Sequence, residues 1–411
     1  MPATTLGEAL NRHNVRLNTT NQVLQTIGLN MVSPFLGILA LKMGATSLEI
    51  GLLSSLPAVA AVVATLPATG LMRRARPQVA ASWLFLGSRF FYLVLASVPL
   101  WAGPAAPIAI AVAWGLMNLP GSAALVAWQA FVARVFPFGR RGAAFAASNR
   151  WMAVAVTLTT VVAGWVIDRI GTPRGYEVVF ACAFAVGVAE VLAFRRLIPP
   201  RRGTVVAAPT VPLREVVANR TYLRYAVLSM AWYLVWQTPW PLFTQYQVNV
   251  LGANNTWLGI LSLTSNIANF AAYSYWARRS ARRGNVPSLG VACMGMALAP
   301  IAMLLSAHLW QLALFNLVTN LFNAGVVLLL FNGLLEMAPE AGRTTALALY
   351  STFTSAAAAV APMIGVAMLA TIGYQASFLI DAACRVAVGY AFFHVVRAHR
   401  MAQATGVQLT M

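Results

Sequence analysis

Two stretches of the chain share one pattern: residues 43–54 read MGATSLEIGLLS, and residues 251–262 read LGANNTWLGILS. The spacing between the shared glycines and the final serine is the same in both copies. An arginine cluster follows each copy about 20 residues later, at residues 73–76 and at residues 278–283. In an apolar chain, a repeat of about half the chain length is typical of membrane proteins whose two related halves enclose a solute site.

The composition predicts that lipid covers most of the protein surface. Of the 411 residues, 60% are hydrophobic and 9% are charged, and the mean hydropathy is +0.72. A soluble domain has about 25% charged residues. We therefore predict an all-α membrane protein whose helices each have the roughly 20 apolar residues needed to cross a bilayer. The twelve predicted transmembrane spans are residues 20–41, 48–72, 79–101, 105–134, 145–167, 176–194, 225–248, 256–277, 287–306, 309–335, 345–370 and 374–396.

The formal net charge of +19 is distributed unevenly along the chain. Arginines gather in alternate loops, whereas the loops between them hold only Lys42, Arg169 and Arg174. This asymmetry follows the positive-inside rule, and it predicts that both termini are cytoplasmic in a multi-pass protein of the cell membrane. We interpret the basic charge as a topology signal that also contacts lipid headgroups, and we expect no nucleic-acid partner.

The repeat extends beyond its opening pattern. Pro137 corresponds to Pro339, and the segment 175–180 corresponds to 373–378. These anchors align spans one to six with spans seven to twelve, and an even number of spans in each half predicts two parallel six-helix repeats. The predicted domains are a cytoplasmic N-terminal segment (1–19), an N-terminal six-helix bundle (20–196), a cytoplasmic linker with an amphipathic helix over 213–225 (197–222), a C-terminal six-helix bundle (223–397) and a cytoplasmic tail (398–411).

The whole chain resembles the major facilitator superfamily in its six-plus-six parallel repeats, long central loop and basic loops after spans two and eight. In the family's motif after span two, Gly70 fits the first glycine, but Arg74 stands where an acid is expected and Pro77 where a second glycine is expected. The resemblance implies transport by alternating access, with the basic loops closing the cytoplasmic side. The residues expected at this gate are Arg73, Arg74, Arg76, Arg278 and Arg279.

The resemblance also implies that spans one, four, seven and ten line a central cavity. At about 100° per residue, each of these spans has polar or aromatic residues on one side. The predicted substrate-binding residues are Gln22, Thr26 and Asn30 on span one, Trp114 and Asn118 on span four, Trp232, Trp236 and Gln237 on span seven, and Asn316, Asn320 and Asn323 on span ten.

These stripes carry no charged side chain, which favours either neutral solutes such as sugars and nucleosides or amphiphilic drugs held by aromatic contact. For each single amide, the alternative is hydrogen bonding between helices. Span eight has a further stripe, which either borders the cavity or packs on neighbouring helices. Its members are Ser262, Ser265, Asn266, Asn269 and Tyr273.

Four charged residues are predicted to lie inside the membrane, where a lone charge is costly and needs a partner. Arg89 on span three is expected to reach Glu190 on span six, because these spans flank each other in the family fold. Asp381 and Arg385 are spaced i, i+4 and are expected to pair on their own helix. Proton coupling through Glu190 or Asp381 is the alternative to structural pairing.

No arrangement of residues points to an enzyme. His13, His308, His394 and His399 are scattered, and the sequence has no nucleophile–base constellation and no metal-ligand cluster. We expect no cofactor and no metal. The predicted function is secondary active or facilitative transport of a small solute by a monomer, with a proton as candidate coupling ion. The alternatives are a multidrug or amphiphile efflux transporter and a non-transporting receptor or lipid scramblase of the same fold.

Overall fold

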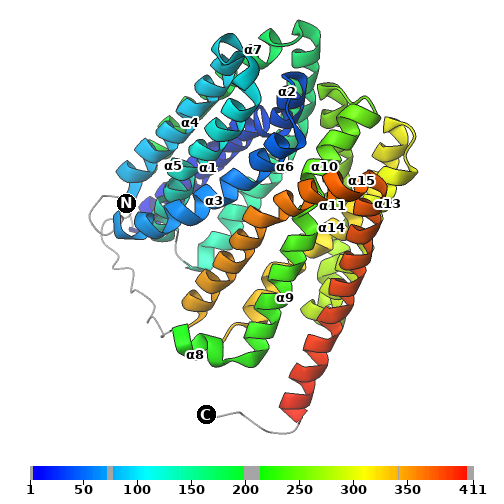
Figure 1. Cartoon of the computed structure of the whole chain (residues 1–411). Helices are drawn as coiled ribbons and strands as arrows, with labels where there is room; N and C mark the ends of the chain where they lie inside the picture. Colours follow the sequence, from blue (N-terminus) through cyan, green and yellow to red (C-terminus); the bar gives the residue numbers. More distant parts are fainter. Residues whose placement is uncertain (1–2, 72–76, 137, 199–212, 341, 405–411) are drawn as a thin grey trace. The chain divides into compact units, whose positions relative to one another are not determined.

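The computed structural model describes residues 3–71, 77–136, 138–198, 213–340 and 342–404. Every regular element in these ranges is helical (Figure 1). The predicted all-α class is therefore confirmed. The chain divides into two compact units, which are residues 1–206 with 253–262, and residues 207–252 with 263–411.

The first unit contains six long helices and one short one. Helix α1 packs on α6 and α7, and α5 packs on both α3 and α4. The helices are α1 (Ala3–Asn30), α2 (Leu36–Lys42), α3 (Ser47–Leu71), α4 (Pro77–Trp101), α5 (Ala106–Val135), α6 (Phe138–Ile170) and α7 (Arg174–Arg195). Because α1 begins at Ala3, most of the predicted N-terminal segment continues the first helix.

The second unit is built around α9 and α12, which both pack on α15. Its helices are α8 (Leu213–Ala218), α9 (Arg220–Gln237), α10 (Trp240–Gln245), α12 (Asn285–Gly295), α13 (Leu298–Leu305), α14 (Leu309–Met337) and α15 (Arg343–Ala404). Helix α11 (Asn255–Arg283) starts in the first unit, which contains residues 253–262, and continues into the second.

Nine stretches of the described residues are long and apolar enough to cross a membrane. One of them, Thr345–His394, covers the two predicted spans 345–370 and 374–396. Gly373, with φ 72°, interrupts α15 between these two spans. The predicted spans 225–248 and 256–277 are not among the nine. The first is broken between α9 and α10, and the second contains many serines and asparagines. The count of twelve spans therefore stays a prediction.

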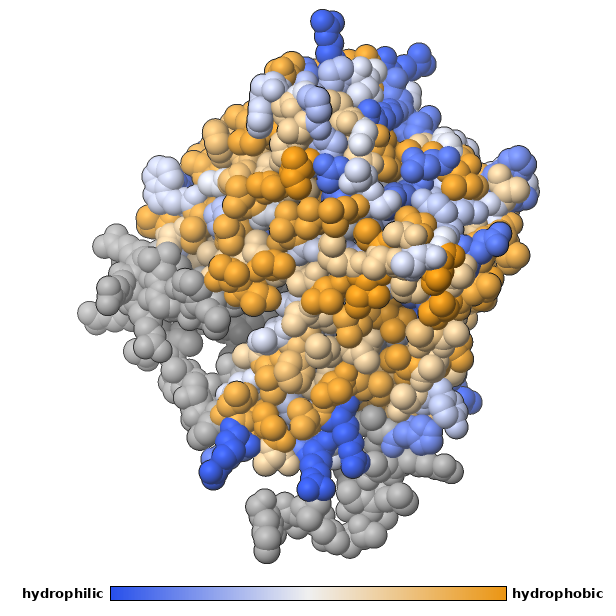
Figure 2. Space-filling model, viewed as in Figure 1, coloured by the Kyte–Doolittle hydropathy of each residue, from blue (hydrophilic) through white to orange (hydrophobic). Residues whose placement is uncertain are grey.

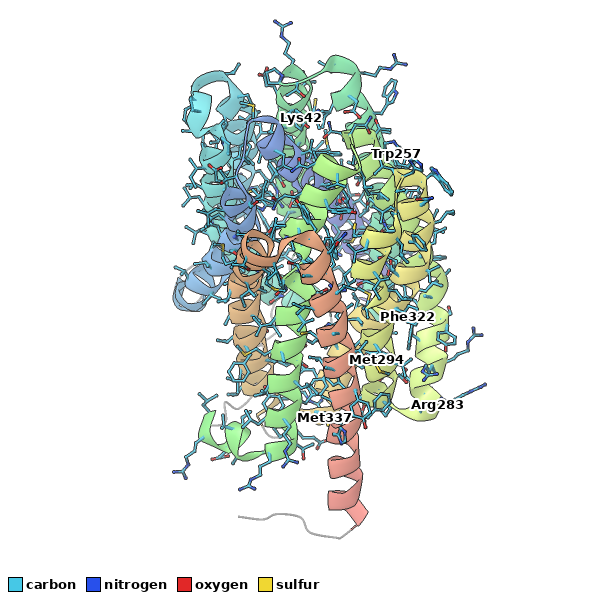
Figure 3. All side chains as sticks on the ribbon, turned by 45° about the vertical axis from the view of Figure 1, so that its right-hand side comes forward. Lys42, Trp257, Arg283, Met294, Phe322 and Met337 are labelled. Carbon is cyan, nitrogen blue, oxygen red and sulfur yellow. The ribbon has the colours of Figure 1, made fainter. Side chains whose placement is uncertain are left out.

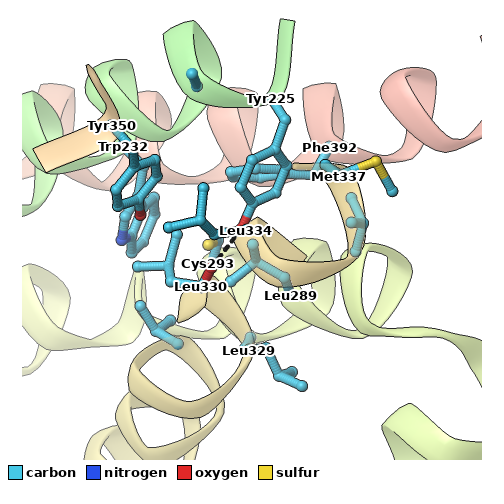
Figure 4. Packing of buried hydrophobic residues seen from close by; sticks show 14 of the residues in the cluster. Tyr225, Trp232, Leu289, Cys293, Leu329, Leu330, Leu334, Met337, Tyr350 and Phe392 are labelled. Atoms are coloured by element: carbon cyan, nitrogen blue, oxygen red, sulfur yellow. Dashed lines mark hydrogen bonds between the residues drawn. The ribbon is translucent and has the colours of Figure 1, made fainter. Parts of the chain in front are cut away.

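Large apolar side chains are exposed along the helices (Figure 2), as expected for a surface that faces lipid. Phe270 is 74% exposed and Leu100 is 72% exposed. The buried cluster in each unit combines aliphatic and aromatic side chains. In the first unit, the rings of Phe131 and Phe194 meet edge-on with centroids 5.3 Å apart. In the second unit, the hydroxyl of buried Tyr225 donates to the carbonyl of Leu330 at 2.7 Å (Figure 4).

The linker helix differs from its prediction. The sequence predicts one amphipathic helix over 213–225, but α8 ends at Ala218 and α9 starts at Arg220. Asn219 separates the two helices, and its Oδ1 accepts a hydrogen bond from the backbone N–H of Tyr222 at 3.0 Å. An asparagine that caps a helix in this way favours a helix start over a continuous helix.

The two copies of the repeat adopt the same backbone turn. Gly44 has φ 89° and Gly252 has φ 69°. Both lie in the left-handed region, which glycine enters without steric cost. In each copy this glycine lies between one helical segment and the next. The left-handed backbone of this turn explains why both copies have a glycine here.

Candidate functional site

The asparagines predicted on span ten form a row between α11 and α14. Asn316 and Asn320 donate to the Oγ of Ser265, at 2.9 and 3.1 Å. One turn further along, Asn323 donates to Oδ1 of Asn269 at 3.3 Å. The spacing i, i+4, i+7 puts the three amides on one face of α14, where they meet the stripe predicted on α11. We call these five residues the amide row.

The amide row serves as an interhelical contact and also stays partly open. All five side chains are half-buried. Within α14, Nδ2 of Asn320 also donates to the carbonyl of Asn316 at 2.9 Å and to its Oδ1 at 3.1 Å. The structure therefore shows hydrogen bonding between helices for the span-ten stripe and for Ser265 and Asn269 of the span-eight stripe, and substrate binding by these residues stays a prediction.

Trp232 and Trp236, predicted on span seven, form a row of rings with Trp240, the first residue of α10. Trp232 and Trp236 lie with ring centroids 6.4 Å apart and nearly parallel planes, and Trp236 meets Trp240 edge-on at 5.8 Å. The three rings differ in exposure. Trp232 is fully buried in the core of the second unit, Trp236 is half-buried and Trp240 is exposed.

Trp232 is predicted as a substrate contact, and its side chain is fully buried in the second unit. It belongs to the same buried cluster as Tyr225 and Cys293 (Figure 4), and its role as a substrate contact stays a prediction. Helical spacing placed Trp232 and Trp236 on one side of α9 but did not show which of them the core covers. Gln237, at the end of α9, is also buried, at 8% exposure.

The candidates in the first unit make their hydrogen bonds within their own helices. Asn30 donates to the carbonyl of Thr26, and Asn118 donates to the carbonyl of Trp114, both at 2.8 Å. Gln22 and Thr26 are buried, whereas Asn30, Trp114 and Asn118 are half-buried. These two hydrogen bonds therefore do not join the candidates on α1 to those on α5.

The predicted ion pair between spans three and six is confirmed. Nε of Arg89 donates to Oε2 of Glu190 at 2.8 Å, and Nη2 donates to Oε1 at 3.0 Å. The two side chains are almost completely buried. Gly187 makes this geometry possible, because a Cβ there would lie 2.8 Å from Cγ of Arg89. A bidentate pair of this kind satisfies both charges without a third group.

The predicted pair on span twelve is also confirmed, with Nε of Arg385 2.8 Å from Oδ2 of Asp381. The same guanidinium donates to the carbonyls of Met296 at 3.0 Å and Trp236 at 3.4 Å. Met296 lies between α12 and α13, and residue 300 is a proline that cannot donate to its carbonyl, which accepts from the N–H of Ala299 at 3.1 Å as well. Arg385 therefore stabilises two helix ends as well as the carboxylate.

Sequence reasoning missed a carboxylate at the start of α11. Asp168, near the end of α6, accepts four hydrogen bonds from two consecutive residues. Its Oδ1 accepts from the backbone N–H of Asn255 at 3.4 Å and from Nδ2 at 2.8 Å. Its Oδ2 accepts from the backbone N–H and the hydroxyl of Thr256, both at 2.7 Å. The anion thus binds the first N–H groups of α11, where the helix dipole favours negative charge.

Two glycines bring the backbones of α6 and α11 together beside this carboxylate. A Cβ on Gly164 would lie 2.4 Å from the carbonyl oxygen of Asn255, and a Cβ on Gly259 would lie 2.8 Å from Cα of Val161. The hydroxyl of Tyr176 also donates to Oδ1 of Asn255 at 2.9 Å. All of these residues belong to the first compact unit. The signal in the sequence was that the second repeat copy lacks the acid that Glu49 supplies in the first.

Two of the expected gate residues, Arg278 and Arg279, lie at the end of α11. Arg278 and Arg279 line a cavity of about 370 Å³ together with Tyr275, Arg282 and Arg283. Arg73, Arg74 and Arg76 lie outside the described residues. Among the described residues, no group of histidines, cysteines and acids could hold a metal ion.

The sequence profile of the Major Facilitator Superfamily matches residues 19–265 and 225–408. The chain belongs to this superfamily. Comparison with curated proteins gave no match. The match covers both repeats. Membership of this superfamily indicates a multi-pass membrane protein that transports a small solute and is not an enzyme.

Solved structures show that this major facilitator shares its fold with transporters of unlike solutes. The nucleoside transporter NupG has a TM-score of 0.65 and 13% identity, covering 94% of this chain and 99% of that one. A bacterial homologue of the iron transporter ferroportin, in its inward-facing state, has a TM-score of 0.70 and 14% identity, covering 93% and 98%. A bacterial homologue of the human lysosomal transporter Spinster has a TM-score of 0.67 and 12% identity, covering 95% and 97%. At these identities, the likeness shows the fold alone.

Proposed function

We propose that this major facilitator carries a neutral, hydrogen-bonding solute with a ring, such as a nucleoside or a sugar. The observation that carries the proposal is the amide row, a partly exposed set of neutral donors and acceptors on α11 and α14. Amides and hydroxyls discriminate strongly between solutes that complete their hydrogen bonds and solutes that do not. The candidates on α1 and α5 are also neutral.

The charges in the membrane-spanning helices support a neutral substrate. Arg89 and Glu190 bind each other, and Arg385 binds Asp381 and two backbone carbonyls. A binding site for an organic anion would need an available arginine or lysine, and one for an organic cation would need an available carboxylate. Neither type of residue occurs in the predicted substrate-binding set.

Trp236 is the residue that we propose to contact the ring of the solute. Its half-buried indole is fixed by neighbours on both sides, since it stacks on Trp232 and meets Trp240 edge-on. A rigid aromatic side chain loses little conformational entropy when a ligand packs on it. The fold shared with NupG, whose name describes a nucleoside transporter, agrees with this proposal without deciding the substrate.

We propose transport by alternating access, with Asp168 as a contact that opens and closes. Its carboxylate and the two glycines hold the first turn of α11 against α6. A helix cap of this type contributes about 0.5–2 kcal/mol, which is small enough to be broken in each cycle. Any movement of α11 away from α6 must release these hydrogen bonds.

We further propose that the protein is a monomer in the cell membrane with both termini in the cytoplasm. The alternation of arginine-rich and arginine-poor loops supports this orientation. If protons drive transport, the two acids buried against arginines, Glu190 and Asp381, are the proposed carriers. Uptake measured with and without an imposed pH gradient distinguishes proton coupling from facilitated diffusion.

The first test is the thermal stability of the detergent-purified protein with uridine, glucose, glutamate and a quaternary ammonium compound. A ligand of the folded state raises the unfolding midpoint by mass action. We expect a shift with a neutral solute that is lost in Asn320→Ala and in Trp236→Ala. The controls Asn149→Ala and Trp83→Ala, at exposed positions, should keep the shift. A shift with the charged compounds alone would overturn the proposal.

A further inference from the structure

The end of α11 holds four arginines around one cavity. Arg278, Arg279, Arg282 and Arg283 line the cavity of about 370 Å³ together with Tyr275. Figure 3 shows Arg283 at the end of this helix, where its side chain points away from the helical bundle. The spacing places Arg278 beside Arg282 and Arg279 beside Arg283 on adjacent turns. Like charges at this spacing destabilise a helix, so an anion between them would stabilise it.

No carboxylate neutralises these arginines in the part of the chain that the structure describes. The sequence has nine acids, and both ion pairs among the described residues, Arg89–Glu190 and Arg385–Asp381, are buried elsewhere. Glu336 accepts a hydrogen bond from Asn285 at 2.9 Å and forms no ion pair there. The helix dipole favours cations at a helix end, but its half charge cannot balance four guanidinium groups.

Arg279 is half-buried beside Trp276 and partly dehydrated. Its guanidinium carbon lies 6.0 Å from the ring centre of Trp276, and its Nε is buried without a hydrogen-bond partner. Trp276 is itself fixed, because its Nε1 donates to the carbonyl of Leu321 at 2.7 Å. A cation that has lost part of its water attracts an anion more strongly than a fully hydrated cation. These contacts distinguish Arg279 from Arg278, Arg282 and Arg283, which are exposed.

We propose that this cavity binds a phosphate group, supplied by the headgroup of an anionic phospholipid. Guanidinium groups match the geometry of phosphate oxygens and can bind two of them at once. The cavity lies at the end of a long helix of a membrane protein, and exposed Tyr275 on its rim is a residue type enriched at the membrane–water boundary. A soluble phosphate ion has the same chemistry, so the test includes it as a separate arm.

The test measures binding of phosphatidylglycerol to the full-length protein in detergent, by native mass spectrometry and by the shift in unfolding midpoint. Phosphatidylcholine, which has no net charge, and inorganic phosphate are measured in parallel. The variant is Arg282→Gln with Arg283→Gln, at exposed positions. The matched control is Arg220→Gln with Arg224→Gln, which removes the same charge from exposed positions on α9.

We expect phosphatidylglycerol to bind more tightly than phosphatidylcholine and the variant to lose about 30-fold in affinity, based on a typical contribution per arginine near a membrane surface. The control should change by less than about threefold, and high salt should weaken binding by the wild type. If inorganic phosphate competes at millimolar concentration, the phosphate site stands and its ligand is soluble. Equal losses in the variant and the control would overturn the site, because they would indicate a general charge effect.

Discussion

Helices α3 and α11 follow the two copies of the repeated segment, and they differ in the carboxylate that accepts hydrogen bonds where the helix begins. In α3 the acceptor is local: the N–H and the hydroxyl of Thr46 donate to Oε2 of Glu49 at 2.8 and 2.9 Å. In α11, Trp257 occupies the place of Glu49, and its N–H donates to Oδ1 of Asn254 at 2.9 Å. The carboxylate comes from Asp168 of α6 instead.

This difference shows how related halves can acquire different roles. A local capping box forms whenever its helix forms, since both partners lie within the same turn. The contact with Asp168 joins residues 88 positions apart, so it can break while α6 and α11 both remain helical. The first copy therefore only starts a helix, whereas the second also ties that helix to a neighbour.

The buried charges show a similar contrast. In the first unit the pair spans two helices, with Arg89 on α4 and Glu190 on α7. In the second unit both members lie on α15, and Arg385 also binds two backbone carbonyls. The guanidinium of the first unit depends on one carboxylate, while that of the second has several acceptors.

The largest expected effect comes from removing a carboxylate from each pair. Glu190→Gln should lower the free energy of unfolding by about 3–5 kcal/mol, because it leaves the buried charge of Arg89 without a counter-ion. Asp381→Asn should cost less, since Arg385 keeps the carbonyls of Met296 and Trp236. Unfolding midpoints in detergent measure both, and equal losses would remove the contrast. Uptake that keeps its dependence on a pH gradient in both variants would exclude them as proton carriers.

A smaller effect is expected where α6 and α11 touch. Gly164→Ala places a Cβ 2.4 Å from the carbonyl oxygen of Asn255, and the helices must separate to accept it. We expect a loss of about 1–3 kcal/mol and slower uptake. The control is Gly87→Ala on α4, where a Cβ meets nothing within 4 Å. If both variants behave alike, the close contact has no functional importance.

The smallest effect compares the two caps directly. Asp168→Asn should cost about 1 kcal/mol and raise hydrogen exchange at the first turn of α11, because the carboxylate no longer accepts from Thr256. It should also change the uptake rate, since it alters a contact between helices. Glu49→Gln should raise exchange only at the start of α3 and leave uptake unchanged. Altered uptake in Glu49→Gln alone would reverse the comparison.

The sequence predicted the features that depend on composition and on local spacing. The helical class follows from hydropathy, the superfamily from the repeat, and the pair Asp381–Arg385 from i, i+4 spacing. The pair Arg89–Glu190 could be predicted only with the family resemblance, because the pair depends on which helices are neighbours. The sequence could not show the cap by Asp168, which joins distant segments, or the break at Asn219, where a single hydrogen bond decides between one helix and two.

The sequence predicted only part of the candidate site, because local spacing does not show how the helices pack on one another. Periodicity placed Asn316, Asn320 and Asn323 on one face, and the structure shows that face against Ser265 and Asn269. Periodicity also placed Trp232 beside Trp236, but Trp232 is fully buried whereas Trp236 is half-buried. A helical pattern tells which residues share a face, and tertiary packing decides which of them remain accessible.

The most direct test of the account is uptake of labelled uridine and glucose, with glutamate and a quaternary ammonium compound for comparison, into proteoliposomes that contain the purified protein. The account predicts saturable exchange of at least one neutral solute, reduced at least about tenfold in Asn320→Ala and unchanged in Trp83→Ala. Transport of the charged compounds alone, or full activity in Asn320→Ala, would contradict it.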